Sequence, residues 1–273
     1  MMVQTERRQL NLWFGLIAWG ALLAVISYGA ALRLPFFTDD PIQLPYAAAR
    51  DLSEIWHSAE GLTYYRPLAF TVWKIMYGLW GRHDATALHA LNLLLHVVNS
   101  LMVGWLADRP TQPGHYPDWR RRYVGAALFL LYPFSFDAVP WIAAVMHPLA
   151  VALVLAGVIS FLKMSATKSR RWAALSLSCV FLAPFAHENG VLAGPLVVAF
   201  ALTQLRGKAS FWSELRQAAW WLVPGFIWWL IWRQVPVDRG ANWLALNNAA
   251  ALLRNGVYFA QGAAYPVTWL GVG

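Results

Sequence analysis

The sequence is divided into long apolar runs by short polar or charged segments, and these runs limit the folds that the chain can adopt. An α-helix needs about 20 apolar residues to cross the hydrocarbon core of a bilayer. Hydrophobic residues make up 59% of the 273 and charged residues only 12%, so water is not the main solvent of this chain. The runs predict seven helices, over 12–32, 87–107, 123–132, 141–162, 172–184, 191–205 and 218–232. We therefore expect an all-α, polytopic membrane protein with about seven transmembrane helices.

Two of the predicted helices, 123–132 and 172–184, are short for a span, so each should extend into its flanks or end in a protein-lined cavity. The first loop, 34–86, is too long for a turn and too apolar for a free linker. Within it, 46–58 and 67–80 have mixed apolar and charged faces and predict two amphipathic helices at the membrane surface. We assign 1–240 to one transmembrane module and 241–273 to an amphipathic or partial transmembrane segment.

The basic residues indicate how the chain is oriented in the membrane. The formal net charge is +8, but the basic residues form short clusters between apolar runs, which is typical of topology signals and argues against nucleic-acid binding. A cytoplasmic N-terminus places most of them on the cytoplasmic side: Arg7, Arg8, Arg109, Arg120, Arg121, Arg122, Lys163, Lys168, Arg170, Arg171, Arg206, Lys208 and Arg216. The first run is longer than a signal-peptide core, so we interpret it as a retained helix. The single cysteine, Cys179, provides neither a disulfide nor a zinc cluster.

Adjacent carboxylates follow the first predicted helix at Asp39 and Asp40. Two carboxylates side by side repel each other unless hydrogen bonds, a cation or a metal compensates. The pair is suited to act as a general base toward a hydroxyl, or Asp40 to bind a divalent metal beside a phosphate. A helix-ending turn with solvated aspartates is the alternative.

Arg66 follows Tyr65 at the start of the second predicted surface helix. The helix dipole opposes a cation near a helix N-terminus, so a phosphate or carboxylate partner is expected. A structural salt bridge to Asp39 or Asp40 is the alternative.

Four polar residues recur on one face of the second predicted membrane helix: His89, Asn92, His96 and Asn99. Polar side chains at membrane depth seldom face lipid, so they line a cavity or form hydrogen bonds between helices. Metal ligation by the two histidines is not expected, because they lie two turns apart and no third ligand is near.

Further polar residues lie at the predicted outer ends of later helices. Asp137 closes the third helix, His147 and Pro148 interrupt the fourth, and His187 and Glu188 link the fifth and sixth. Each alone is compatible with an ordinary loop residue. The predicted topology, however, places them on the same side as Asp39 and Asp40, which favours a shared site.

Five segments, FFTDD at 36–40, YYRPL at 64–68, HALNLLLHVVN at 89–99, LYPFSFDAV at 131–139 and AHENG at 186–190, give the chain a resemblance to a known family. In order and spacing they resemble the GT-C glycosyltransferase superfamily, near the protein O-mannosyltransferases, the transmembrane-and-TPR O-mannosyltransferases and the lipid A aminoarabinose transferases. The resemblance covers roughly residues 10 to 235.

The resemblance implies a seven-helix module that receives a polyprenyl-phosphate-linked sugar donor from the outer leaflet. Asp40 or Asp39 would serve as the base, or as a ligand of Mg²⁺ or Mn²⁺ on the donor phosphate. Arg66 would hold that phosphate, and the remaining cavity residues would be Tyr65, His89, Asn92, His96, Asp137, His147, His187 and Glu188.

We therefore expect a glycosyltransferase of the plasma (cell inner) membrane that transfers a sugar to an acceptor hydroxyl at the non-cytoplasmic face. Its expected partners are membrane lipids and the donor. A non-catalytic subunit that packs against neighbouring membrane subunits is the alternative. A transporter fits less well, because no pair of Gly- or Pro-interrupted spans is repeated in two halves.

Overall fold

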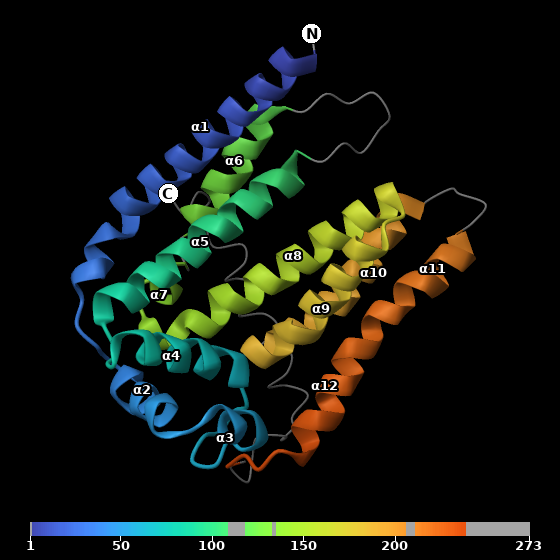
Figure 1. The fold of residues 1–273 in the computed structure, drawn as a ribbon. Coiled ribbons are helices and arrows are strands. Elements are labelled where there is room, and N and C mark those ends of the chain that lie inside the picture. Colours follow the sequence, from blue (N-terminus) through green and yellow to red (C-terminus); the bar gives the residue numbers. More distant parts are fainter. Residues whose placement is uncertain (1, 109–117, 133–134, 206–210, 239–273) are drawn as a thin grey trace, which may run out of the picture.

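The computed structural model describes residues 2–108, 118–132, 135–205 and 211–238. Throughout this part the regular secondary structure is helical, with one isolated bridge between Ala59 and Val237, so the all-α prediction is confirmed. Figure 1 shows long helices that run side by side and shorter ones gathered at one end.

The long helical segments follow the order of the predicted runs. They are α1 (Met2–Tyr28) with η1 (Gly29–Arg33), α5 (Ala85–Ala107), α6 (Trp119–Leu130), η2 (Ile142–Val145) with α8 (Met146–Thr167), α9 (Arg170–Ala186), η3 (Glu188–Leu192) with α10 (Ala193–Leu205), and α11 (Phe211–Ala219), η4 (Trp220–Leu222) and α12 (Val223–Gln234). The short α7 (Ser135–Ala138) lies between α6 and η2. Successive long segments run in alternating directions (Figure 1).

Three described segments are long and apolar enough to cross a membrane: Leu10–Arg33, Ala85–Ala107 and Ile142–Thr167. They correspond to the first, second and fourth predicted spans. The other four predicted spans are helical but shorter, with 12 residues in α6, 17 in α9, 13 in α10 and 12 in α12. Three-ten turns precede α10 and α12, which divides the apolar runs there. The chain thus has the helices of a membrane protein, and seven spans remain a prediction.

His147 and Pro148 do not interrupt the fourth helix as expected. Both lie in the first turn of α8. The first turn has no intrahelical acceptor for its N–H groups, so a proline there breaks no hydrogen bond of the helix. The irregular backbone lies just before, in η2.

The first loop forms three helices, α2 (Asp40–Ala49), α3 (Leu52–His57) and α4 (Pro67–Trp80). The prediction for 67–80 is confirmed as a helix. The single helix predicted over 46–58 is wrong, because the chain is extended at Arg50 and Asp51. Asp51 then caps α3 in a capping box with Glu54, which provides a strong local start signal.

The first loop packs against the ends of the long helices, not away from them. One buried apolar cluster contains Tyr65 and Trp73 from the loop, Ile142 from η2 and Phe185 from α9. Figure 1 shows α2, α3 and α4 together at the end of the molecule opposite the N-terminus. This core holds the candidate site residues of the loop against those of later helices.

Candidate functional site

Asp40 connects the first loop to the segment before α8. It is fully buried, its Oδ2 accepts from the backbone N–H of Phe37 at 3.1 Å, and its Oδ1 accepts from that of Ala143 at 2.7 Å. Burial raises the pKa of this carboxyl, and the two N–H donors oppose that rise. With both oxygens occupied by backbone donors, Asp40 anchors α2 to η2.

Asp39 lies in a different environment, although it is the adjacent residue. It is the N-cap residue of α2 and is partly exposed, and its Oδ2 accepts from Gln43 Nε2 at 3.4 Å. The residue before it, Thr38, has φ +54°, a left-handed conformation that is rare for a β-branched residue. Strain of this kind is concentrated at functional sites. Of the two predicted acids, Asp39 is the one that is partly exposed.

Arg66 forms a bidentate ion pair with Glu188, which is 122 residues away in the sequence. Arg66 Nε donates to Glu188 Oε1 at 3.1 Å and to Oε2 at 2.9 Å, and Nη2 lies 2.9 Å from Oε2. The side chains are 18% and 31% exposed. Arg66 Nη1 contacts the thioether sulfur of Met146, and the guanidinium lies 4.3 Å from the centre of the Tyr64 ring. The predicted carboxylate partner of Arg66 is thus Glu188.

Two histidine rings lie beside this ion pair. The rings of His147 and His187 pack with their centres 4.3 Å apart. The N–H of Asn189 donates to His187 Nδ1 at 3.1 Å, so Nδ1 carries no proton. Burial, together with Arg66 and His147, lowers the pKa of His187 to about 3. His187 is therefore neutral, and its 3.5 Å approach to Glu188 is not an ion pair.

The adjacent residues Tyr64 and Tyr65 differ in burial and in their neighbours. Tyr65 is buried, its hydroxyl donates to the carbonyl of Trp56 at 2.7 Å, and with Tyr64 and Arg66 it lines a small cavity of about 10 Å³. Tyr64 is half-buried and lies in the electrostatic field of Arg66, Asp39 and Glu188. Burial raises the pKa of its hydroxyl to about 12. Tyr64 belongs to the YYRPL segment, but the sequence predicted Tyr65, and not Tyr64, as the cavity residue.

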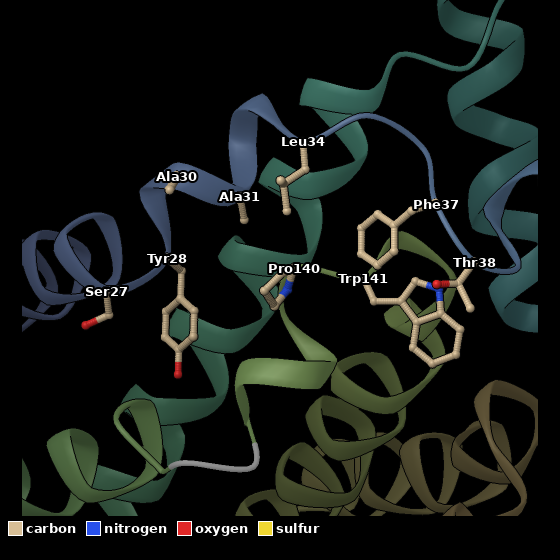
Figure 2. Close-up of a pocket in the computed structure, with 9 residues that line it drawn as sticks. All are labelled: Ser27, Tyr28, Ala30, Ala31, Leu34, Phe37, Thr38, Pro140 and Trp141. Atoms are coloured by element: carbon tan, nitrogen blue, oxygen red, sulfur yellow. The ribbon is translucent and has the colours of Figure 1, made fainter.

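A groove of about 660 Å³ begins next to Asp39. Its lining is mostly apolar and comes from the end of α1, from η1, from the loop after it and from the segment before η2: Ser27, Tyr28, Ala30, Ala31, Leu34, Phe37, Thr38, Pro140 and Trp141. Figure 2 shows Tyr28 at one end of the groove and Thr38 beside Trp141 at the other. An apolar ligand in this groove would reach the strained turn that carries Asp39.

The polar face of α5 is directed at backbone carbonyls. His89 Nε2 lies 3.1 Å from the carbonyl of Leu34, Asn92 Nδ2 is 2.7 Å from that of Trp141, His96 Nε2 is 3.0 Å from that of Leu130, and Asn99 Nδ2 is 2.8 Å from that of Pro148. All four side chains are buried. Hydrogen bonding between segments is therefore the role that the structure gives them, and none lines the groove.

The remaining predicted site residues are Asp137, a cavity residue, and Asp40, the metal ligand. Asp137 lies in α7, but its side chain is outside the described part of the chain. Asp40, the predicted metal ligand, is buried and accepts one backbone N–H on each oxygen. Asp39 offers a single carboxylate, and the described residues hold no group of three His, Cys, Asp or Glu side chains suited to a metal ion. The Mg²⁺ or Mn²⁺ requirement, with Asp40 or Asp39 as ligand, stays a prediction.

Comparison with family models, with curated proteins and with solved structures finds no match for this chain. Its function is therefore argued from the site itself.

Proposed function

We propose that this chain is a membrane glycosyltransferase that transfers a sugar from a polyprenyl-phosphate donor to an acceptor hydroxyl at the non-cytoplasmic face. The observation that carries the proposal is the meeting of an apolar groove with a charged cluster. Thr38, the residue before Asp39, lines the groove, and Tyr64 lies within electrostatic range of Asp39, Arg66 and Glu188. The proposed donor also has an apolar and a charged part: its long apolar chain suits the groove, and its phosphate-linked sugar suits the charged cluster.

The residues can be given roles that balance the reaction. Asp39 accepts the proton of the acceptor hydroxyl while the hydroxyl oxygen bonds to the anomeric carbon. The bond from that carbon to the phosphate oxygen breaks, and its electron pair leaves with the lipid phosphate. Among the described residues, the hydrogen-bond partner of Arg66 Nη1 is the sulfur of Met146, a weak acceptor, so a phosphate oxygen is a better partner for it.

Asp40 and Glu188 position these groups and do not touch substrate in this scheme. Asp40 holds α2 against η2, which fixes the direction of the Asp39 backbone. Glu188 occupies two nitrogens of Arg66 and so fixes its guanidinium plane. A preorganised cation of this kind stabilises charge on the leaving phosphate without rearranging during the reaction.

A non-catalytic membrane subunit is the second candidate, and one observation favours it. Asp40 accepts from two backbone N–H groups and Arg66 pairs with Glu188 without any substrate, which is sufficient to explain them as structural residues. In that case Asp39 and the groove do not bind substrate, and replacing Asp39 changes neither ligand binding nor sugar transfer.

Binding of polyprenyl phosphate to the purified chain in lipid nanodiscs tests the proposal. Loss of a charge-assisted contact to phosphate is worth about 1.5–3 kcal/mol, so we expect Arg66→Gln to weaken binding by at least about tenfold. Arg82→Gln is the matched control, since Arg82 is 79% exposed at the end of the same loop. Equal binding by wild type and both variants would contradict the proposal.

A further inference from the structure

A second groove lies at the other end of the helical bundle, away from the candidate site. It has a volume of about 360 Å³ and is bounded by α1, α5 and α8. Trp13 comes from α1, Leu101 and Trp105 from α5, and Ile159 and Lys163 from α8. The three helices are the ones long and apolar enough to span a membrane, so the groove is formed between membrane-spanning segments.

The polar and apolar parts of this groove lie at different depths. Trp13, Trp105 and Lys163 each stand within a few residues of the same end of their span: the spans are Leu10–Arg33, Ala85–Ala107 and Ile142–Thr167. A helix rises about 1.5 Å per residue, so Leu101 and Ile159 lie roughly 6 Å further into the span than Trp105 and Lys163. The groove therefore has an aromatic and cationic mouth at headgroup depth and an apolar floor at acyl-chain depth.

Lys163 is a cation without a carboxylate partner among the described residues. Its Nζ lies 4.3 Å from the centre of the Trp172 ring and 5.9 Å from that of Trp105, which holds the ammonium at the groove mouth. Arg122 at the same end is different, because Asp108 neutralises it at 2.6 Å. The charge of Lys163 therefore remains to attract an anion.

We propose that this groove binds an anionic glycerophospholipid. Its phosphate pairs with Lys163 between the two indole rings, and one acyl chain lies along Leu101 and Ile159. Exposed cations at the same end, Arg120, Arg171 and Lys168, add to the local positive potential. Basic pockets between transmembrane helices on the side predicted here to be cytoplasmic suit such headgroups. The site is separate from the glycosyltransferase proposal and does not depend on it.

Lipid preference of the purified chain tests this inference. Native mass spectrometry in detergent would compare retention of dioleoylphosphatidylglycerol with that of dioleoylphosphatidylcholine. We expect wild type to prefer the anionic lipid by about tenfold, the size of one charge-assisted hydrogen bond. Lys163→Gln should lose that preference, whereas Lys163→Arg should keep it.

Arg171→Gln is the matched control, because Arg171 is an exposed cation at the same end but does not line the groove. It should keep the wild-type preference. Thermal unfolding in phosphatidylcholine alone checks that Lys163→Gln is folded. The inference is overturned if Lys163→Gln keeps the preference, or if Arg171→Gln loses it to the same extent, which would indicate diffuse attraction to the whole basic end.

Discussion

The two aspartates at the start of α2 show how strongly one residue's position determines its role. Asp40 is buried and accepts hydrogen bonds from two backbone N–H groups, whereas Asp39 is partly exposed at the N-cap beside a groove. The sequence predicted an acidic pair at this place but could not divide the roles. That division depends on the N–H of Ala143, which is 103 residues further along the chain.

Asp40→Asn should lower stability more than Asp39→Asn. An amide at position 40 places an NH₂ group opposite a backbone N–H and leaves that buried donor without an acceptor, which costs about 1–3 kcal/mol. The Asp39 side chain makes no cap hydrogen bond in α2, and the Oδ1 of Asn can still accept from Gln43, so that variant should unfold like wild type. Chemical unfolding in detergent measures both. Equal stability of the two variants would show that Asp40 is not the anchor described above.

His187 predicts a pH dependence of stability. Its pKa is about 3 in the folded chain and has its ordinary value near 6.5 in the unfolded chain. The unfolded state therefore binds more protons between these values, so the His187 contribution is fully present above pH 6.5 and is lost as pH falls toward 3. His187→Gln should flatten this fall relative to wild type in unfolding measured from pH 7 to pH 4. Parallel curves would mean that folding does not lower the pKa of His187.

At the scale of elements, local signals predicted much but not the irregular segments. The proline at 67 and the apolar pattern up to Trp80 correctly predicted α4. The three-four-three spacing correctly predicted one polar face on α5. The targets of that face, the carbonyls of Leu130, Trp141 and Pro148, were not predictable, because they lie 34 to 49 residues further along the chain.

Close packing of α5 on α6 gives a test at this scale. A Cβ added at Gly104 would come within 2.6 Å of the backbone oxygen of Arg122, so the two helices must separate. Gly104→Ala should therefore destabilise the chain by about 1–3 kcal/mol, despite the better helix propensity of alanine. Gly20→Ala is the control, since its nearest neighbour would be Leu101 at 3.8 Å. If both variants were equally stable, the contact between α5 and α6 would be looser than described.

For the whole molecule, the alternating segments place the candidate site and the basic clusters at opposite ends (Figure 1). The order of the apolar runs predicted this alternation. It could not show which of the shorter helices cross a membrane, because a helix of 12 or 13 residues crosses only where neighbouring protein covers its ends.

Labelling with a membrane-impermeant maleimide tests the predicted orientation. Cysteine would be placed at the exposed positions Glu60 and Arg171 in a Cys179→Ala background. Glu60→Cys should react in intact cells, since its loop is predicted to be non-cytoplasmic, and Arg171→Cys should react only after permeabilisation. The reverse pattern would place Asp39 and Arg66 in the cytoplasm and would rule out transfer at the outer face.

Sugar transfer in membranes that carry the chain is the most direct test of the proposed activity. The membranes would receive polyprenyl phosphates bearing radiolabelled hexoses, and label attached to hydroxyl-bearing acceptors would be counted. A general base contributes about 10²–10⁴-fold to a rate, so Asp39→Asn should reduce transfer at least about 100-fold. Asp51→Asn, an exposed carboxylate change that keeps a good N-cap in the same loop, should transfer like wild type. Transfer that is unchanged in Asp39→Asn, or no greater with the wild-type chain than in membranes without it, would contradict a catalytic role for this site.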